Sequence, residues 1–200
     1  RDLDAVIALD PDHLSCYGLV FEPGTPLSEK QRLGRIDAID DSVEAAMYDL
    51  TRTRLAAEGF EQYEISNWAR PGEACLHNLV YWEAGDWLAI GPAAAGNLGG
   101  IRYRNLPRLD DWLQGSGLSS VVNVDEPSAS VANGERLMLG LRLRRGIERS
   151  VFEGLVRGHA ERAAAVSRHL ERENLVWQED RLRIADGSVM LADEILSDLL

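Results

Sequence analysis

A histidine, an asparagine and two aromatic residues lie close together in this 200-residue sequence, at His77, Asn78, Tyr81 and Trp82. A neutral imidazole is a good ligand for a transition metal or a haem iron, and the two rings could flank a flat macrocycle. Cys75 lies two residues before the histidine, but these two side chains give at most two metal ligands, and a structural zinc site needs four. The same residues could also form a hydrogen-bonded corner of the core, because a histidine among aromatic residues is often structural.

A run of small residues follows at 91–100, with the sequence Gly-Pro-Ala-Ala-Ala-Gly-Asn-Leu-Gly-Gly. It could cradle a phosphate or a nucleoside, but it lacks the GxGxxG spacing and no helix is expected directly after it. A close crossing of two backbone segments is therefore favoured. Arg102 and Arg104 alternate in a strand-like segment that comes next, and they could bind carboxylates or simply be solvated.

Two further pairs of residues could do chemistry near the ends of expected strands. His13 and Ser15 would share one strand face, but a nucleophile–base pair needs a third, orienting group that the sequence does not identify, so a structural role is favoured. Glu22 and Glu64 lie near strand ends, where the sites of barrel enzymes gather. Either glutamate could instead be solvated.

The composition excludes several functional classes. The net charge of −12 argues against a nucleic-acid groove and an anionic membrane surface, since both need a positive footprint. No apolar run is long enough for a membrane helix, so no stable membrane insertion is expected. Two cysteines make no disulfide framework, which predicts a reduced, cytoplasmic setting. The sequence begins as if inside a helix, and we expect a fragment whose N-terminal part is missing.

The elements that would position these residues begin with an α/β pattern. The periodicity predicts the end of a helix, a buried strand, a polar loop, a capped helix and another strand, at 1–9, 13–21, 26–39, 41–57 and 62–68 respectively. Alternation of strand and helix is typical of a parallel sheet or a barrel. One or two such units cannot close a sheet alone.

The pattern changes after a short expected strand at 86–90, a short helix at 109–113 and a linker at 115–125. Helices, a hairpin with an acidic turn and a closing helix are then predicted, at 128–143, 151–156, 160–173, 176–184 and 191–200 in that order. This order suggests a small winged-helix-like domain. Its third helix has no basic face, so DNA reading is disfavoured, and His159 and His169 are expected at the surface.

With these segments laid out, several motifs resemble one family in the right order. They are His13-Leu14-Ser15-Cys16-Tyr17, Glu22-Pro23-Gly24-Thr25-Pro26, Tyr63 to Gly72, His77-Asn78-Leu79-Val80-Tyr81-Trp82, Ile90-Gly91-Pro92 and Leu137 to Leu143 before Gly146. Over essentially its whole length the chain resembles the C-terminal half of radical SAM proteins of the oxygen-independent coproporphyrinogen III oxidase-like family. Within that family it is closer to the haem-chaperone branch.

The resemblance implies an α/β fold: the C-terminal end of a partial (β/α)6 radical SAM barrel, followed by a small helical, winged-helix-like domain. The implied domains are 1–115 for the barrel portion with the HNxxYW segment, 116–127 for a linker, and 128–200 for the helical domain. The strand expected at 13–21 would be the last of the barrel.

The resemblance also implies ligands. HNxxYW is the motif that separates haem chaperones from true oxidases, so haem contact is carried onto His77, Asn78, Tyr81 and Trp82, with haem-accepting proteins as partners. Relatives hold a [4Fe–4S] cluster and S-adenosyl-L-methionine through a CxxxCxxC loop, which is absent here, so no metal ligand for the cluster is assigned. By similarity, Val20 and Ala95 fall where the family contacts S-adenosylmethionine.

Two alternatives stay open beside a haem-delivering chaperone of the radical SAM superfamily. One is an oxygen-independent coproporphyrinogen III oxidase, a radical decarboxylase of porphyrin biosynthesis, although the fragment alone is not expected to be catalytic. The other is a non-functional, truncated paralogue, suggested by the missing loop and by Ala93-Ala94-Ala95, where the family usually has Gly-Ala-His.

Overall fold

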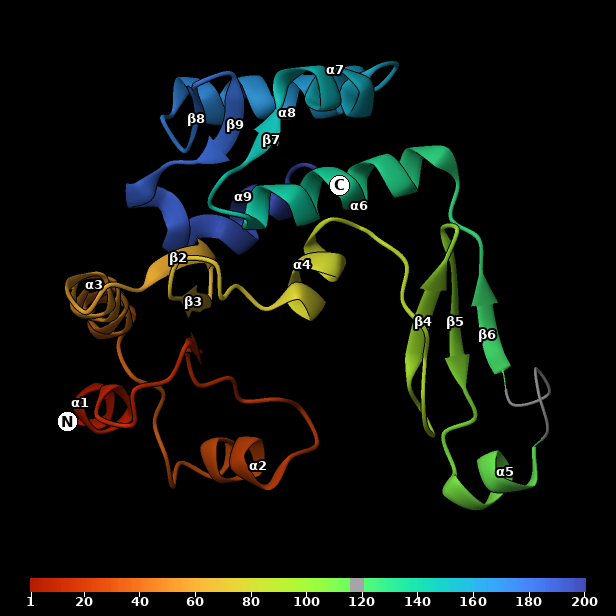
Figure 1. Ribbon diagram of the computed structural model, residues 1–200, viewed down its shortest axis with the longest axis horizontal. Coiled ribbons are helices and arrows are strands. Elements are labelled where there is room, and N and C mark those ends of the chain that lie inside the picture. Colours follow the sequence, from red (N-terminus) through yellow and green to blue (C-terminus); the bar gives the residue numbers. More distant parts are fainter. Residues whose placement is uncertain (116–120) are drawn as a thin grey trace. The chain divides into compact units, whose positions relative to one another are not determined.

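The computed structural model describes residues 1–115 and 121–200, and they form two compact units, 1–74 and 75–200 (Figure 1). Both units combine helices with short sheets, one in the first unit and two in the second, so the fold is α/β. No helix in the described part of the chain is long and apolar enough to cross a membrane.

The first unit contains three helices and one three-stranded sheet. The helices are α1 (Asp2–Ile7), α2 (Pro26–Arg32) and α3 (Asp41–Ala57), and the strands are β1 (His13–Ser15), β2 (Glu61–Glu64) and β3 (Asn67–Ala69). The strand order is β1-β3-β2, with both pairs antiparallel. Strand β3 is therefore the central strand of this sheet, with β1 on one side and β2 on the other.

Helix α3 positions the core of the first unit. Its N-terminus is capped by Asp40, whose carboxylate accepts a hydrogen bond of 2.8 Å from the backbone N–H of Ser42. Near its other end Leu55 is fully buried and clusters with Phe60 and Trp68. The last turn of α3 thereby holds the β2–β3 hairpin against the helix.

The second unit contains six α-helices and two sheets within its described residues. The helices are α4 (Leu76–Trp82), α5 (Leu109–Gln114), α6 (Ala129–Arg142), α7 (Arg149–Val156), α8 (Ala160–Glu171) and α9 (Ala192–Ser197), with a 3-10 helix at Asp186–Leu191. The strands are β4 (Ala95–Leu98), β5 (Ile101–Asn105), β6 (Val121–Asp125), β7 (Ile147–Glu148), β8 (Leu175–Gln178) and β9 (Arg181–Ile184). Their orders are β4-β5-β6 and β7-β9-β8.

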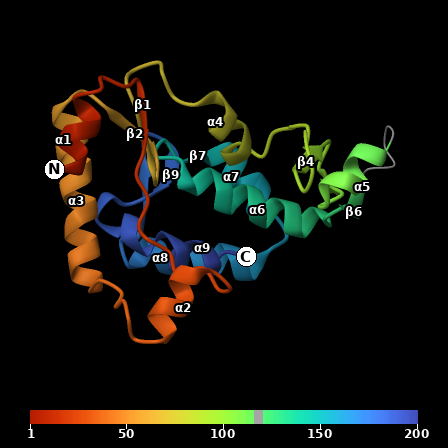
Figure 2. The same ribbon diagram turned by 90° about the horizontal axis from the view of Figure 1, so that it is seen from below.

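Helix α6 is the central element of the second unit (Figure 2). Leu137 and Leu141 on its buried face are at most 1% exposed, and Leu182 of β9 is fully buried. The chain turns sharply after α6 at Gly146, where φ is +65° and an added Cβ would lie 2.2 Å from the carbonyl oxygen of Leu182. Only glycine fits this turn, because both the backbone angle and the space exclude a side chain.

The structure corrects the strand predictions of the first unit. The strand expected at 13–21 ends at Ser15, and the strand expected at 62–68 is a hairpin of β2 and β3. All strand pairs in the described residues are antiparallel, so the predicted parallel pairing is wrong there. For β2 and β3 the physical reason is the tight turn at Ile65-Ser66, which returns the chain beside its own preceding strand.

Other segments also differ from prediction. The expected polar loop at 26–39 begins with helix α2, which has Pro26 in its first turn and Thr25 as its cap, accepting from Ser28 N–H. Residues 116–120 of the predicted linker lie outside the described residues, while 121–125 form strand β6, paired with β5. The strand expected at 86–90 is reduced to one isolated bridge between Trp87 and Asn97.

Several predictions are confirmed within a few residues. The capped helix at 41–57 is α3, the helices at 128–143 and 160–173 are α6 and α8, and the hairpin at 176–184 is β8 and β9. The helices expected at 151–156 and 191–200 are α7 and, over a shorter range, α9.

Candidate functional site

Helix α4 carries the whole HNxxYW motif. His77 and Tyr81 are four residues apart and so share one face of the helix. The edges and faces of their rings meet almost at right angles, with centroids 4.8 Å apart. His77 is exposed, and its ring nitrogens make no hydrogen bond to any residue that the structure describes. The imidazole is therefore accessible to a ligand.

A third aromatic ring continues this arrangement. Trp87 lies against Tyr81 with ring centroids 4.5 Å apart and an angle of 64° between the planes. We call the rings of His77, Tyr81 and Trp87 the aromatic row. Sequence reasoning missed Trp87 as a site residue, because it lies beyond the end of α4. The available signal was Gly85, which belongs to the turn that follows the helix.

The segment around Trp87 is held by hydrogen bonds to β4. Its backbone N–H donates to the carbonyl of Asn97 at 2.8 Å and its carbonyl accepts from the N–H of Asn97 at 3.0 Å. Its indole N–H donates to the carbonyl of Ala95 at 2.9 Å. The amide of the buried Asn97 donates to the carbonyl of Gly85 at 2.8 Å. Trp87 is thus fixed in both backbone and side chain.

Trp82 contacts a different part of the unit. The guanidinium of Arg142, at the end of α6, lies over its ring at 4.8 Å from the centroid. Both the indole N–H of Trp82 and the Nε of Arg142 are buried without a hydrogen-bond acceptor among the described residues. The next residue, Glu83, forms an ion pair with Arg145. Trp82 and Glu83 together fasten α4 to the end of α6 and to the turn that follows it.

The two candidate arginines of β5 already have partners. Arg102 forms ion pairs with Asp125 of β6 and Glu135 of α6, and these hydrogen bonds raise the pKa of its guanidinium. Arg104 is exposed and donates from Nε to the carbonyl of Ala93 at 3.0 Å. Arg102 is therefore occupied by carboxylates of this chain.

The two positions carried over for S-adenosylmethionine are both exposed. Val20 lies in the irregular segment between β1 and α2, with 66% of its surface exposed. Ala95 is the first residue of β4, and its carbonyl accepts the indole hydrogen bond of Trp87.

The candidate residues of the first unit form a structural network. His13 Nε2 lies 2.8 Å from the hydroxyl of Tyr63. Ser15 donates to the side-chain oxygen of Asn67, whose amide in turn donates to Glu64. No His13–Ser15 bond is present among the described contacts, so they form no nucleophile–base pair. Glu64 is fully buried, which excludes the solvated alternative for this residue.

The two remaining histidines, His159 and His169, differ in how deeply they are buried. His159 is partly buried and lies 3.4 Å, Nδ1 to Oγ, from Ser130. His169 is 2% exposed, so its predicted surface position is wrong. Asn174 lies on one side of its ring, 3.3 Å from Nδ1, and Asp198 on the other, 3.3 Å from Nε2. The charged residues around His169 in the sequence indicated a surface position, but His169 lies on the buried face of α8.

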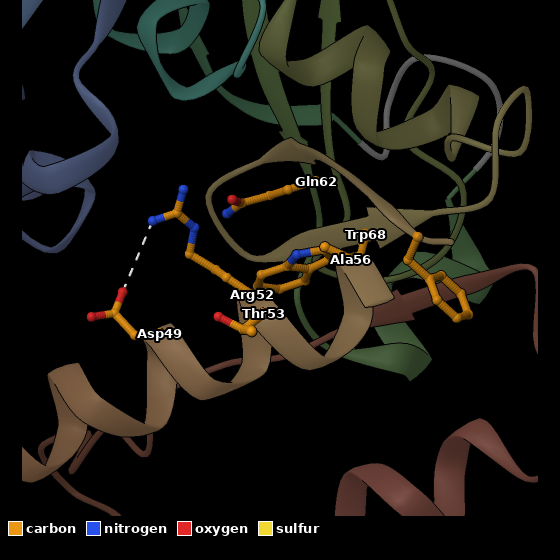
Figure 3. A pocket seen from close by; sticks show the side chains of 7 residues that line it. Asp49, Arg52, Thr53, Ala56, Gln62 and Trp68 are labelled. Atoms are coloured by element: carbon orange, nitrogen blue, oxygen red, sulfur yellow. Dashed lines mark ion pairs between the residues drawn. The ribbon is translucent and has the colours of Figure 1, made fainter. Parts of the chain in front are cut away.

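A hollow of about 560 Å³ lies in the first unit beside α3 (Figure 3). The indole of Trp68 forms part of its wall, with Gln62 and Arg52 beside it. Its polar groups have partners within the unit: Gln62 donates to the carbonyl of Ile65 at 2.9 Å, and Arg52 lies 3.9 Å from a carboxylate oxygen of Asp49. These contacts leave little reason for a polar ligand to bind there.

The described residues offer no metal centre of their own. They contain no group of three or more His, Cys, Asp and Glu side chains that could hold a metal ion. Cys16 and Cys75 are both free thiols. Burial raises the pKa of the Cys16 thiol, which keeps it protonated.

Comparison with known proteins gives consistent relatives, although no protein-family model matches the sequence. The chain is 38% identical over 203 residues to "Heme chaperone HemW" of Mycobacterium tuberculosis, covering all of this chain and 50% of the relative. It is 27% identical over 201 residues to "Heme chaperone HemW" of Lactococcus lactis, covering all of this chain and 53% of that relative. The chain thus spans about half the length of these curated relatives.

One solved structure shares the fold. It is described as "Coproporphyrinogen III oxidase (HemN) from Escherichia coli is a Radical SAM enzyme", and it matches 98% of this chain and 50% of its own with a TM-score of 0.74 at 15% identity. The likeness extends through both units, and at this identity it concerns the fold alone. In sequence and over its whole length, this chain is a homologue of the HemW heme chaperones.

Proposed function

We propose that this chain is the haem-contacting portion of a haem chaperone, which binds haem and passes it to haem-accepting proteins. The observation that carries the proposal is the exposed imidazole of His77, placed over the ring of Tyr81 on a helix whose sequence matches HNxxYW. Homology to proteins named for haem chaperoning supports it.

The chemistry of the site fits haem as cargo. A neutral histidine nitrogen is a common axial ligand of haem iron, and His77 has no competing hydrogen bond to a described residue. Tyr81 supplies an aromatic surface next to it. The exposed apolar side chains of Leu76, Leu88 and Ile90, at 78%, 67% and 86% exposure, lie just before and after this region in the chain and would suit an apolar macrocycle.

The other motif residues have supporting roles in this proposal. Asn78 belongs to the proposed contact set through its place in the motif. Trp82 would define the orientation of α4, because its ring is covered by Arg142. Pairing of a haem propionate with an arginine would fall to Arg104, since Arg102 already holds two carboxylates.

The wider architecture is also a proposal. We assign residues 1–115 to the C-terminal portion of a partial (β/α)6 barrel and 128–200 to a winged-helix-like domain, with strand β6 at 121–125 between them. The likeness to HemN across 98% of the chain supports this arrangement. A cytoplasmic location is proposed with it.

S-adenosylmethionine and a [4Fe–4S] cluster are proposed only for the longer protein. The described residues do not fit a cluster, because no three potential ligands come together, and we derive no step through it. Val20 and Ala95 are each proposed as contacts of S-adenosylmethionine, offering exposed apolar surface and backbone groups.

The haem assignment is tested by titrating haemin into the full protein and into a His77→Ala variant while following the Soret band. We expect the variant to shift the band and to bind at least about tenfold more weakly, equivalent to about 1.4 kcal/mol. His159→Ala is the matched control, because this histidine lies outside the motif and should leave the spectrum unchanged. An identical spectrum and affinity in His77→Ala would remove the assignment.

A radical decarboxylase is the competing class. The likeness to the HemN oxidase is one of fold and does not favour that activity for this chain. An anaerobic assay of the complete, cluster-loaded protein with coproporphyrinogen III separates the two. Formation of protoporphyrinogen IX would establish the oxidase, and its absence alongside haemin binding would support the chaperone.

A further inference from the structure

Trp87 is the one member of the aromatic row that lies outside the HNxxYW motif. Its ring contacts Tyr81 at 4.5 Å, and Tyr81 in turn contacts His77 at 4.8 Å. Edge-to-face contacts at these distances stabilise one relative orientation of the rings. Tyr81 therefore contacts two rings, that of the candidate iron ligand and that of Trp87.

Trp87 has less freedom than the helix that it supports. Helix α4 has seven residues, no side-chain cap and no fully buried residue. A helix of this length has little stability of its own. Trp87, in contrast, exchanges two backbone hydrogen bonds with Asn97 and donates a third from its indole to Ala95. The orientation of the aromatic row is thus set from the β4 side.

The turn between α4 and Trp87 transmits this constraint. Gly85 N–H donates to the carbonyl of Val80 at 2.8 Å, Ala84 N–H donates to Tyr81 at 3.0 Å, and Ala84 has a left-handed φ of 52°. These bonds form a Schellman-type helix end, which fixes the direction in which the chain leaves the helix. Trp87 consequently returns beside Tyr81 instead of continuing away from it.

We propose that Trp87 is a positioning residue of the haem-contact surface: its indole holds Tyr81, and through it His77, in place and fastens them to strand β4 at Ala95. This inference rests on the proposed haem-binding function and adds to it a residue outside the motif. It also explains why Tyr81 and Trp87, six residues apart in the sequence, are in contact: the turn between them brings their rings together.

Two substitutions separate the two contacts of the indole. Trp87→Phe keeps a ring beside Tyr81 but removes the hydrogen bond to Ala95, whereas Trp87→Leu removes both. In haemin titrations of the full protein we expect about threefold weaker binding for Trp87→Phe and about tenfold for Trp87→Leu. Trp112→Phe, in α5 of the same unit, is the matched control and should bind as the unsubstituted protein does.

A second measurement observes Trp87 in the unsubstituted protein and uses a variant only to assign its signal. The tryptophan indole N–H signals are recorded by NMR in the full protein, and that of Trp87 is identified by its loss in Trp87→Phe. Adding haemin should broaden or shift the Trp87 signal and leave that of Trp177, on β8, unchanged. A tryptophan remote from the bound haemin would not report the ligand in this way.

The possible outcomes distinguish the proposed haem-binding function from the proposed role of Trp87. Absence of haemin binding by the unsubstituted protein would overturn the proposed function together with this inference. Binding that depends on His77, with wild-type affinity in Trp87→Leu or an unmoved Trp87 signal, would overturn the inference about Trp87 and leave the haem function standing.

Discussion

At the scale of single residues, the chemistry of the chain depends on which side chains remain accessible. His77 and Tyr81 could be paired from the sequence, because positions four apart share a helix face. Trp87 could not, since its contact depends on the turn after α4. Trp82, adjacent to Tyr81 in sequence, instead lies under Arg142. Proximity in the sequence therefore predicted two members of the aromatic row and not the third.

Cys16 provides a prediction at this scale. Burial raises the pKa of its thiol, because a thiolate is poorly solvated there. In a Cys75→Ser background, the pH profile for alkylation by iodoacetamide should have its midpoint higher in the folded protein than in the urea-unfolded chain. Mass spectrometry of the modified peptide measures the rate at each pH.

The raised pKa of Cys16 also determines how the stability of the protein changes with pH. The folded state retains its proton to higher pH than the unfolded state, so the contribution of Cys16 to stability is present at low pH and decreases as pH rises through the thiol range. A folded-state midpoint equal to or below that of the unfolded chain would contradict the assigned burial effect.

At the scale of elements, helix α4 ends on a residue that fits its conformation poorly. Ala84 occupies the left-handed position of the Schellman-type turn, with φ of 52°, where glycine is usual. Ala84→Gly should therefore raise the free energy of unfolding, by up to about 1 kcal/mol, because it removes the strain of the Cβ. Urea unfolding monitored by circular dichroism gives the value.

A matched substitution tests the reasoning about Ala84. Ala164 is exposed in the interior of α8, where the backbone is helical. Ala164→Gly should lower the free energy of unfolding by about 1 kcal/mol, since glycine has more conformational freedom to lose. Equal and destabilising effects of both substitutions would show that the turn at Ala84 imposes no strain.

Elements with strong local signals were predictable, and those defined by tertiary pairing were not. The apolar spacing of residues 41–57 predicted α3 within a residue, although its cap is Asp40 and not Asp41 or Ser42 as the sequence indicated. The strand predicted at 13–21 is shorter in the structure, because apolar residues do not by themselves imply burial: Tyr17, Leu19 and Val20 are 66–72% exposed. Antiparallel pairing could not be derived, since register depends on the turn at Ile65-Ser66 and not on periodicity.

The candidate site followed the same division. The HNxxYW residues were identifiable from the sequence because they form one local motif. The residues that hold α4, Arg142 and Arg145, lie about 60 residues later, and nothing in the sequence pairs them with the motif. Their role depends on how α6 folds back beside α4.

At the scale of the whole molecule, each compact unit has a core of its own. Leu55 is fully buried in the first unit and Leu137 in the second. Truncating either to alanine should cost about 2–5 kcal/mol through lost burial and the cavity left behind. In hydrogen exchange followed by mass spectrometry, Leu55→Ala should lower protection first in residues 1–74 and Leu137→Ala first in residues 75–200.

The exposed residues Val43 and Leu50 on α3 provide the control for these truncations, with exposures of 48% and 62%. Their substitution by alanine should leave protection nearly unchanged, because little apolar surface returns to water. Equal loss of protection throughout the chain after each core truncation would contradict a separate core in each unit.

The attachment of α4 through Trp82 and Glu83 to the end of α6 has a practical consequence for reconstructing the motif outside this protein. A synthetic peptide of residues 76–82 would contain every letter of HNxxYW and still lack the groups that give the helix its form. Transplanting the motif into another scaffold would require equivalents of Arg142, Arg145 and Trp87. The motif should accordingly be treated as a sequence marker whose geometry is supplied by more distant residues.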